Sequence, residues 1–449
     1  MRKLRLACLG LAALGAVVLV VGLAMGAPSV WQPALVVTGF GISIGLGAVP
    51  ALAGYQYTGW VIACACVALV YPRGFTSWGG VELTDKLLIN TIIQLVMFGM
   101  AIHMRITDFR GVARQPRGVL VGLLGHYLVM PTMAFVLIHI FDLPSGVALG
   151  VLLYGSVSSG LASNVMSLLA RANLGLAVTI TAMSTILAPL ATPALMKLFA
   201  GRIVEVGFVS TMFDVIQITL VPVGAALLVD FLRNATPRGT RVVDCTALTA
   251  AAWLVVAAAL WDPLTSGISA NGTRALQQVC YVAGAVILAR VYYAGERRYG
   301  AVGRAMPYVS MFGIMYYNTV VTAAARDTVL AVGGVLLLIG LIHNLTGFTF
   351  GYWGARASRL DVASSRSVAF EIGMQNGGAA SGLAASMGMI ATAGVPAAVF
   401  SPLGNVTGSL LANYWSRRPV EEGQEEERDR EEPASAQEPE PAARERAAG

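Results

Sequence analysis

Apolar segments of membrane-spanning length alternate with short polar loops along most of the chain. A helix needs about 20 apolar residues to cross the hydrocarbon core of a bilayer, and Pro or Gly can interrupt such a helix. On this basis we count fourteen segments: 6–27, 33–54, 57–72, 85–104, 117–140, 145–171, 174–199, 207–232, 245–261, 274–293, 305–325, 329–354, 366–388 and 393–415. The pattern predicts an all-α polytopic membrane protein.

Two of these segments carry polar and glycine residues in their middle. Residues 158–164 (SSGLASN) interrupt the segment 145–171, and residues 371–378 (EIGMQNGG) interrupt the segment 366–388. Irregular backbone at membrane depth is tolerated only where protein or water satisfies its polar groups. A pair of interrupted segments in corresponding halves is typical of secondary transporters that bind their substrate near the bilayer midplane.

A weak internal repeat supports this interpretation. His126 precedes the first break and His343 precedes the second, and each break is followed by a Pro-containing segment. An odd number of spans separates the equivalent elements, so the two halves would insert in opposite orientations. The repeat therefore predicts two inverted halves, each with one interrupted helix.

The charge distribution predicts the topology. The chain has 449 residues, of which 56% are hydrophobic and 12% charged, with a mean hydropathy of +0.70. Residues 421–449 hold eleven acidic and four basic side chains, which leaves 26 basic and 13 acidic ones for the rest. The basic residues cluster in loops 105–117, 233–241, 290–304 and 356–366, which all face the cytoplasm if the N-terminus does. We therefore expect a bacterial inner membrane protein with both termini cytoplasmic.

Nucleic-acid binding and enzymatic activity find no support in the sequence. The basic loops fit membrane topology rather than nucleic-acid binding. No nucleophile–base pair, metal-ligand cluster or phosphate-binding glycine loop is present, so we expect neither enzymatic activity nor a cofactor.

The C-terminal residues 417–449 are rich in Glu, Pro, Ala and Arg, and we expect a disordered acidic cytoplasmic tail. The cysteines lie in or beside apolar segments without ligand or disulfide spacing: Cys8, Cys64, Cys66, Cys245 and Cys280.

Several motifs resemble those of the bile acid:sodium symporter family. They are residues 162–166 (ASNVM), 169–173 (LARAN), 371–376 (EIGMQN), 408–412 (GSLLA), 97–100 (MFGM) and 108–109 (DF). The resemblance covers roughly residues 57–416 and implies a ten-helix inverted-repeat core, with five helices in each of two repeats at residues 57–200 and 201–416. Two crossed discontinuous helices would lie in a core domain, and a panel domain would face it. Residues 1–56 would then form two extra N-terminal helices. Residues from about 244 to 293 would form an inserted helical hairpin.

The resemblance also implies two sodium sites where the broken helices cross. The matching positions for the first site are Ser163, Asn164, Thr181 and Glu371. Those for the second are Glu371, the Ile372 and Met374 carbonyls, and Gln375. The chemistry is reasonable, because a hard cation prefers several oxygen ligands, and unwound backbone supplies carbonyls beside the side-chain oxygens. Asn376 and Asn405 are expected in the substrate cavity.

Three positions depart from the family pattern. Ala177 stands where a serine ligand is common, so the first site lacks one oxygen. His126 replaces a common glutamine and opens the alternative that a proton takes the place of one sodium ion. Gly404 stands where a histidine is common beside Asn405.

These features predict sodium-coupled symport of a small organic anion, bile acid-like, keto acid or pantoate-like, by alternating access. The positive ends of the half-helix dipoles at the breaks suit a carboxylate or sulfonate. The alternatives are proton coupling and a non-transporting membrane sensor or scaffold on the same fold. Metalloid efflux would favour a soft thiolate at the first break, where residues 145–171 contain no cysteine. The sequence leaves the oligomeric state open.

Overall fold

The computed structural model describes residues 2–49, 52–201 and 207–418. Every one of the fourteen apolar segments coincides there with a helix or an interrupted helix. Within this part of the chain nine helices are long and apolar enough to cross a membrane, or ten if one bent pair counts as a single span. Apart from Arg417 and Arg418, the predicted acidic tail lies outside the described residues.

The ten-helix core consists of two groups of helices that pack mainly among themselves. The panel group comprises α3 (Gln56–Val70), α4 (Lys86–Ala101), α10 (Phe208–Val215) with its continuation α11 (Val221–Asn234), and α15 (Ala301–Ala324). The core group comprises α6 (Pro116–Ile140), α7 (Ser145–Ser156), α8 (Ala162–Leu169), α9 (Leu174–Ala200), α16 (Arg326–Ala357), α17 (Val362–Gly373), α18 (Gly377–Ser386) and α19 (Gly394–Ser416).

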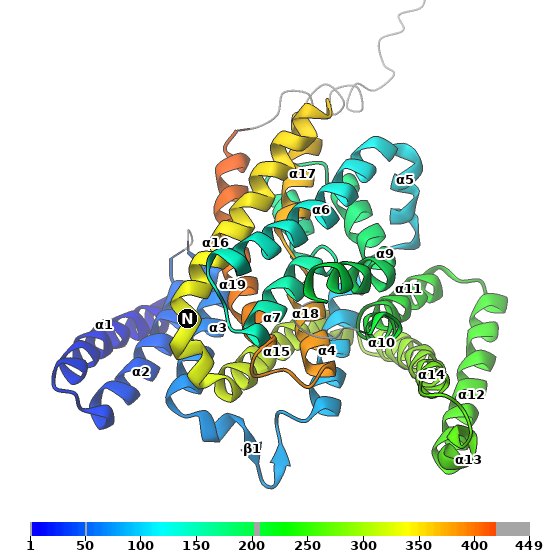
Figure 1. Cartoon of the computed structure of the whole chain (residues 1–449), viewed down its shortest axis with the longest axis horizontal. Helices are drawn as coiled ribbons and strands as arrows, with labels where there is room; N and C mark the ends of the chain where they lie inside the picture. Colours follow the sequence, from blue (N-terminus) through cyan, green and yellow to red (C-terminus); the bar gives the residue numbers. More distant parts are fainter. Residues whose placement is uncertain (1, 50–51, 202–206, 419–449) are drawn as a thin grey trace, which may run out of the picture.

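Four further long helices lie on two flanks of this core (Figure 1). On one flank, α1 (Arg2–Ala24) and α2 (Pro28–Leu46) form a hairpin that packs on α3. On the opposite flank, α12 (Pro237–Ala259), the short α13 (Trp261–Thr265) and α14 (Ala270–Arg298) form an inserted hairpin that packs on α10 and α11. Its helices extend beyond residues 244–293 because their polar ends are still helical: Pro237 occupies the first turn of α12, and the Thr236 side chain caps it.

The span containing α10 and α11 has an internal π-helical turn, η4 (Ile216–Leu220). Pro222 follows directly, and its missing N–H removes the α-helical hydrogen bond to the Ile218 carbonyl. A π-bulge is one way to accommodate such a gap. Hydropathy alone predicted an uninterrupted segment here, because the average over 207–232 does not register one proline.

The short connections mark the two ends of the bundle. At one end, β1 (Ser77–Trp78) pairs antiparallel with β2 (Val81–Glu82) through Gly79 and Gly80, which both have positive φ as a tight hairpin requires. We call this the hairpin end. At the other, α5 (Gly111–Arg114) and the α16–α17 turn carry the arginine-rich loops, and we call this the basic end (Figure 1). The remaining short elements are η1 (Ala53–Tyr55), η2 (Pro72–Phe75) and η3 (Ile106–Arg110).

The largest buried cluster surrounds the first interrupted helix. All residues of α7 from Val147 to Ser156 are buried, as expected for a short helix that is apolar on every side. The partner α18 is built from Ala, Gly and Ser, which lets neighbouring backbones approach closely. Both half-helices are therefore enclosed by protein, which satisfies the requirement for irregular backbone inside a membrane.

A buried arginine fastens the second interrupted helix at the basic end. Arg366 of α17 is 5% exposed, and its Nη1 donates to the Ala170 carbonyl just beyond α8 at 3.1 Å. Its Nη2 donates to the Arg418 carbonyl beyond α19 at 2.7 Å. The guanidinium thus caps the C-terminal ends of two other helices, where unpaired carbonyls favour a cation.

Candidate functional site

The two helix breaks cross and complete each other's backbone hydrogen bonds. The first break comprises residues 157–161 and the second residues 374–376. Gly160 N donates to the Met374 carbonyl and Asn376 N to the Ser158 carbonyl, both at 2.9 Å. Ser159 and Gln375 therefore form an isolated antiparallel bridge. Each unwound segment alone would leave unpaired backbone groups, which are costly in a membrane. The two segments pair these groups with one another.

Glycine is required where the two breaks touch. A Cβ added to Gly160 would lie 2.6 Å from the Gln375 carbonyl oxygen. A Cβ added to Gly377, the first residue of α18, would lie 1.8 Å from the Ser401 hydroxyl of α19. The glycines of the broken motifs thus permit close packing of backbone against backbone and of α18 against α19.

Glu371, in the last turn of α17, is the chemical centre of the crossing. Its side chain is fully buried, with 0% exposure. Carboxylate oxygen Oε2 accepts hydrogen bonds from the Ser159 and Thr181 hydroxyls, each at 2.7 Å. The Ser163 hydroxyl lies against Oε1. Three hydroxyl oxygens from α8, α9 and the first break therefore surround one carboxylate.

The structure brings together three of the four residues predicted for the first sodium site. Ser163, Thr181 and Glu371 are in direct contact, and all are fully buried. Asn164 is more peripheral, with its Oδ1 at 3.4 Å from the Thr181 hydroxyl. The set offers the hydroxyl, amide and carboxylate oxygens that a hard monovalent cation would use.

Ser159 belongs to this cluster although the sequence analysis did not select it. Ala177 lies one turn before Thr181 on α9, and the Thr181 hydroxyl contacts the Ala177 carbonyl at 3.2 Å. The oxygen missing at Ala177 has a counterpart in the Ser159 hydroxyl, which donates to the same Glu371 oxygen as the Thr181 hydroxyl. The only available sequence signal was the Ser158–Ser159 pair beside Gly160, which did not reveal which serine faces Glu371.

The second predicted set lies on the adjoining turn. Gln375 Nε2 donates to the Ile372 carbonyl at 2.8 Å, which fixes the orientation of the amide. Its buried Oε1 has no donor among the described residues. The Met374 carbonyl accepts from Gly160 N and lies 3.5 Å from the Ser159 hydroxyl. Glu371, the two carbonyls and Gln375 therefore lie within residues 371–375, which span the last turn of α17 and the start of the second break.

His126 of α6 joins the two breaks through its imidazole ring. The ring is fully buried, with Nδ1 at 2.9 Å from the Glu371 carbonyl and Nε2 at 2.8 Å from the Val157 carbonyl. Both nitrogens thus face backbone acceptors, one in the last turn of α17 and one in the first break. The predicted role of His126 in ion or proton coupling remains a prediction, and the geometry adds a supporting role for the crossing. His343 of α16 is also buried, and its Nε2 contacts the Met130 carbonyl at 3.1 Å.

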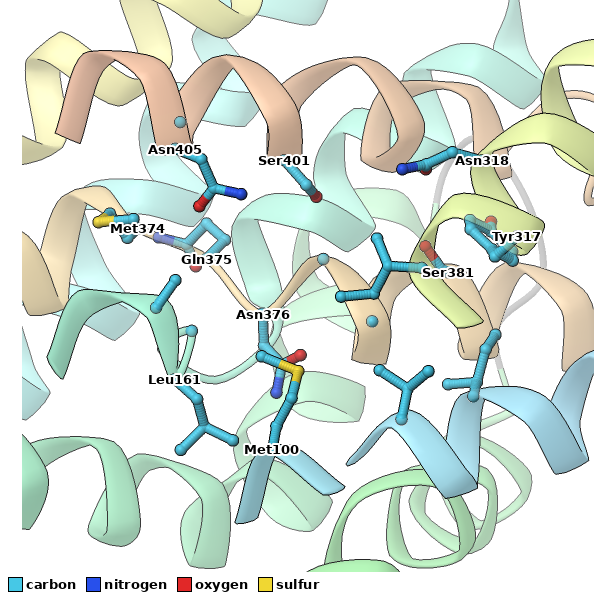
Figure 2. A pocket seen from close by; sticks show the side chains of 18 of the residues that line it. Met100, Leu161, Tyr317, Asn318, Met374, Gln375, Asn376, Ser381, Ser401 and Asn405 are labelled. Atoms are coloured by element: carbon cyan, nitrogen blue, oxygen red, sulfur yellow. The ribbon is translucent and has the colours of Figure 1, made fainter. Parts of the chain in front are cut away.

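A small cavity lies between the panel and core groups beside the crossing (Figure 2). Its volume is about 90 Å³. Gln375 and Asn405 lie on the core side, and Tyr317 and Asn318 of α15 on the panel side. Asn376, the third predicted amide, also lines it, although its Oδ1 accepts from Ala379 N and so caps α18. Ordinary ligand pockets measure roughly 300–1,000 Å³, so the groups must separate before a bulky molecule enters.

The small cavity borders a larger cavity at the basic end and is closed toward the hairpin end. It shares Met100 and Leu161 with a cavity of about 800 Å³ that opens at the basic end. Toward the hairpin end, Asn90 Nδ2 of α4 donates to the Ser386 hydroxyl of α18 at 3.2 Å, and Lys86 Nζ donates to the Ser386 carbonyl. These bonds join panel to core and close that side.

Comparisons with known proteins agree with this architecture. A model of the sodium bile acid symporter family matches residues 91–262. The sodium-dependent transporter YocS of Bacillus subtilis (strain 168), which is uncharacterized, is 30% identical over 367 residues, covering 82% of this chain and 92% of the relative. The chain belongs to the sodium bile acid symporter family. Its fold is accordingly a ten-helix core of panel and core groups with four additional helices.

Other sodium bile acid symporter relatives match more distantly. The probable sodium/metabolite cotransporter BASS1 of Arabidopsis thaliana chloroplasts is 26% identical, covering 80% of this chain and 72% of the relative. The ileal sodium/bile acid cotransporter of Homo sapiens is 24% identical, covering 70% of this chain and 73% of the relative. Among solved structures, the sodium proton antiporter MjNhaP1 of Methanocaldococcus jannaschii aligns over 93% of this chain and 99% of its own, with 14% identity and a TM-score of 0.45.

Proposed function

We propose that the protein is a secondary active transporter that moves a small organic anion together with sodium by alternating access. The observation that carries this proposal is the environment of Glu371. Its carboxylate is fully buried, and none of the ion pairs among the described residues involves it. Burying an unpaired carboxylate is costly, whereas a cation held by the surrounding oxygens would compensate the charge.

The first sodium ion would be held by Glu371, Ser163, Thr181 and Asn164, with Ser159 in place of the oxygen missing at Ala177. The second would use Glu371, the Ile372 and Met374 carbonyls and Gln375. Because both sets lie at the point where the breaks meet, a bound cation would neutralise Glu371 and hold α8 against α17. Ion binding would thereby order the turn that begins α18 and lines the substrate cavity.

The substrate would bind in the cavity between Asn405 and Asn318. The positive end of the α18 dipole and the amide groups favour an anionic group there. We propose a bile acid-like, keto acid or pantoate-like anion, and the volume of the cavity favours the smaller ones in this conformation. The proposed setting is the bacterial inner membrane, with both termini cytoplasmic and the basic end facing the cytoplasm.

We propose that residues 57–200 and 201–416 act as the two inverted repeats. Alternating access would then come from the panel group rocking against the core group while the crossing stays intact. In the described conformation the small cavity borders the larger cavity at the basic end, and hydrogen bonds bridge α4 and α18 toward the hairpin end, which supports an inward-facing assignment.

The test is uptake of labelled taurocholate, pyruvate and pantoate into proteoliposomes under an inward sodium gradient. We expect uptake of at least one anion with sodium but not potassium, and a loss of roughly tenfold or more in Glu371→Gln or Gln375→Ala. Glu82→Gln, which changes an exposed carboxylate of β2, is the matched control. Sodium-dependent uptake that survives either core substitution refutes the ion assignment.

The same preparation separates the alternatives. Uptake that follows a proton gradient and ignores sodium favours proton coupling. Absence of uptake, together with absence of any sodium-dependent rise in the thermal midpoint, favours a sensor or scaffold, because a ligand stabilises only a state that binds it.

A further inference from the structure

The inserted hairpin encloses a second, larger cavity at the hairpin end of the bundle. The cavity measures about 930 Å³, within the ordinary range of ligand sites. Its walls come from α14 and Trp261 on the hairpin, from α10 and the first turn of α4 on the panel group, and from Ser386 at the end of α18. Figure 1 shows α14 running alongside α10 and α11, with α13 at the lower edge. The inserted helices are therefore not only lipid-facing additions.

The charged groups in this cavity come from three different helices. Arg274 of α14 has its Nη1 3.9 Å from Asp214 Oδ1 of α10, which is too far for a hydrogen bond, and its guanidinium makes no hydrogen bond among the described residues. Lys86 of α4 also acts on Asp214 electrostatically and donates to the Ser386 carbonyl. The fourth charged group, Asp85, accepts from Leu88 N at 3.0 Å and caps α4. Arg274 therefore has a long ion pair with Asp214, and its guanidinium N–H groups, which make no hydrogen bond among the described residues, can donate to a further carboxylate.

Two buried acceptor oxygens on lining residues have no donor among the described residues. Gln278 Nε2 donates to the Phe213 carbonyl at 3.1 Å, which fixes the amide orientation and leaves Oε1 unpaired. Asn90, which is 5% exposed, donates to the Ser386 hydroxyl through Nδ2 and keeps Oδ1 unpaired. Unpaired buried acceptors are costly. Both oxygens are covered by protein in this conformation, so a ligand's hydroxyl or amide N–H reaches them only when the two side chains turn toward the cavity.

The cavity lies directly beyond the closed side of the substrate cavity. Asn90 is one turn from Ile93 on α4, and Ser386 is five residues from Ser381 on α18; Ile93 and Ser381 line the substrate cavity. The two cavities share no lining residue, and the bonds from Asn90 and Lys86 to Ser386 lie between them. A molecule in the larger cavity therefore lies beside the contact between α4 and α18. We call this contact the α4–α18 seam, and it must open before the molecule can reach the substrate cavity.

We propose that this cavity is a separate binding site for the transported organic anion, formed with the inserted hairpin and occupied before the α4–α18 seam opens. The anion's carboxylate pairs with the Arg274 fork, and its hydroxyl or amide groups donate to Asn90 and Gln278. A bidentate guanidinium–carboxylate pair is directional. This directionality carries the recognition, because the lining carboxylates Asp85 and Asp214 balance the charges of Lys86 and Arg274. The proposal rests on the proposed function and extends it to how substrate is collected.

The test combines binding with uptake on the full-length protein. Trp261 lines the cavity, so we expect taurocholate, pyruvate or pantoate to change its fluorescence in sodium-free buffer, with Trp261→Phe identifying the signal. Pantoate, which has two hydroxyl donors beside its carboxylate, should bind better than pyruvate, which has none. We expect Arg274→Gln to weaken this binding and raise the uptake KM by about tenfold at unchanged kcat, with Arg274→Lys intermediate. Arg238→Gln, an exposed arginine on α12, is the matched control.

Glu371→Gln separates this proposal from the proposed function. If both hold, Glu371→Gln abolishes sodium-dependent uptake and leaves the Trp261 fluorescence response intact. A protein that transports nothing but keeps an Arg274-dependent response retains the binding site and refutes only the transport assignment. A Trp261 signal that none of the three anions alters, or a response and KM within twofold of wild type in Arg274→Gln, overturns the proposed site.

Discussion

Replacing Gly160 by alanine should force the two helix breaks apart. The added Cβ would lie 2.6 Å from the Gln375 carbonyl oxygen, and ordinary contacts begin at 3.4 Å, so the segments must separate by about 0.8 Å. The two hydrogen bonds that join the breaks, Gly160 N to Met374 O and Asn376 N to Ser158 O, measure 2.9 Å. A separation of that size stretches both to about 3.7 Å, beyond the length at which they count as hydrogen bonds.

The energetic consequence follows from burial of these groups. Each buried donor left without a partner costs about 1–3 kcal/mol, so two of them cost about 2–6 kcal/mol. The same movement draws Glu371 away from Ser159 and Ser163, which lie on the first break and on α8. Since 1.4 kcal/mol corresponds to a factor of ten, we expect the apparent sodium affinity of Gly160→Ala to fall by roughly tenfold or more.

The assay is the sodium dependence of the thermal midpoint in detergent, measured beside sodium-driven uptake in proteoliposomes. Gly224→Ala on α11 is the matched control, because a Cβ there meets no atom within 4 Å and alanine favours a helix. We expect the control to match wild type within twofold. If Gly160→Ala keeps the wild-type sodium response and uptake, close backbone contact at the crossing is not needed and the reasoning from its geometry is wrong.

Three further substitutions test neighbouring parts of the structure. Ser159→Ala should lower the apparent sodium affinity, measured from the sodium dependence of the thermal midpoint, by roughly tenfold. Adding Ala177→Ser should restore part of that affinity. If the second change restores none of it, the two oxygens are not equivalent. Arg366→Ala should lower the free energy of unfolding by about 2–4 kcal/mol, seen as a lower thermal midpoint, because capping bonds to two helix ends are lost. Arg417→Ala should leave the midpoint unchanged. His126→Ala should reduce both the thermal midpoint and uptake. His126→Gln should retain more of each, because the glutamine amide can donate to one of the two carbonyls. Equal behaviour of the two variants would exclude a hydrogen-bonding role for His126.

Much of this fold was predictable because membrane helices follow from local composition. The fourteen apolar segments and both breaks could be read from runs of apolar residues and from glycines among polar groups. The π-helical turn was not predictable in this way, because an apolar run does not distinguish one helical hydrogen-bonding pattern from another. The lengths of α12 and α14 were also underestimated, because their ends are polar and only capping at Thr236 marks where α12 begins.

The site was predictable only where a family motif covers it. The resemblance placed Ser163, Thr181 and Glu371 in one site, and the structure brings them into contact. Ser159 was missed because its bond to Glu371 joins residues 212 positions apart, and no local pattern encodes that meeting. The cavity beneath the inserted hairpin was invisible for the same reason, since Arg274, Asp214 and Lys86 come from three separate helices.

The mutual pairing of the two breaks has a consequence for biogenesis. The first interrupted helix leaves the ribosome more than 200 residues before the second, which at ordinary translation rates is a delay of roughly 10–40 s. During this interval the Gly160 amide and the Ser158 carbonyl lack the partners that they have in the finished protein. The nascent half must therefore wait with its unwound turn hydrated or shielded by the insertion machinery, so truncation or slowed synthesis between the repeats would expose this turn to quality-control proteases.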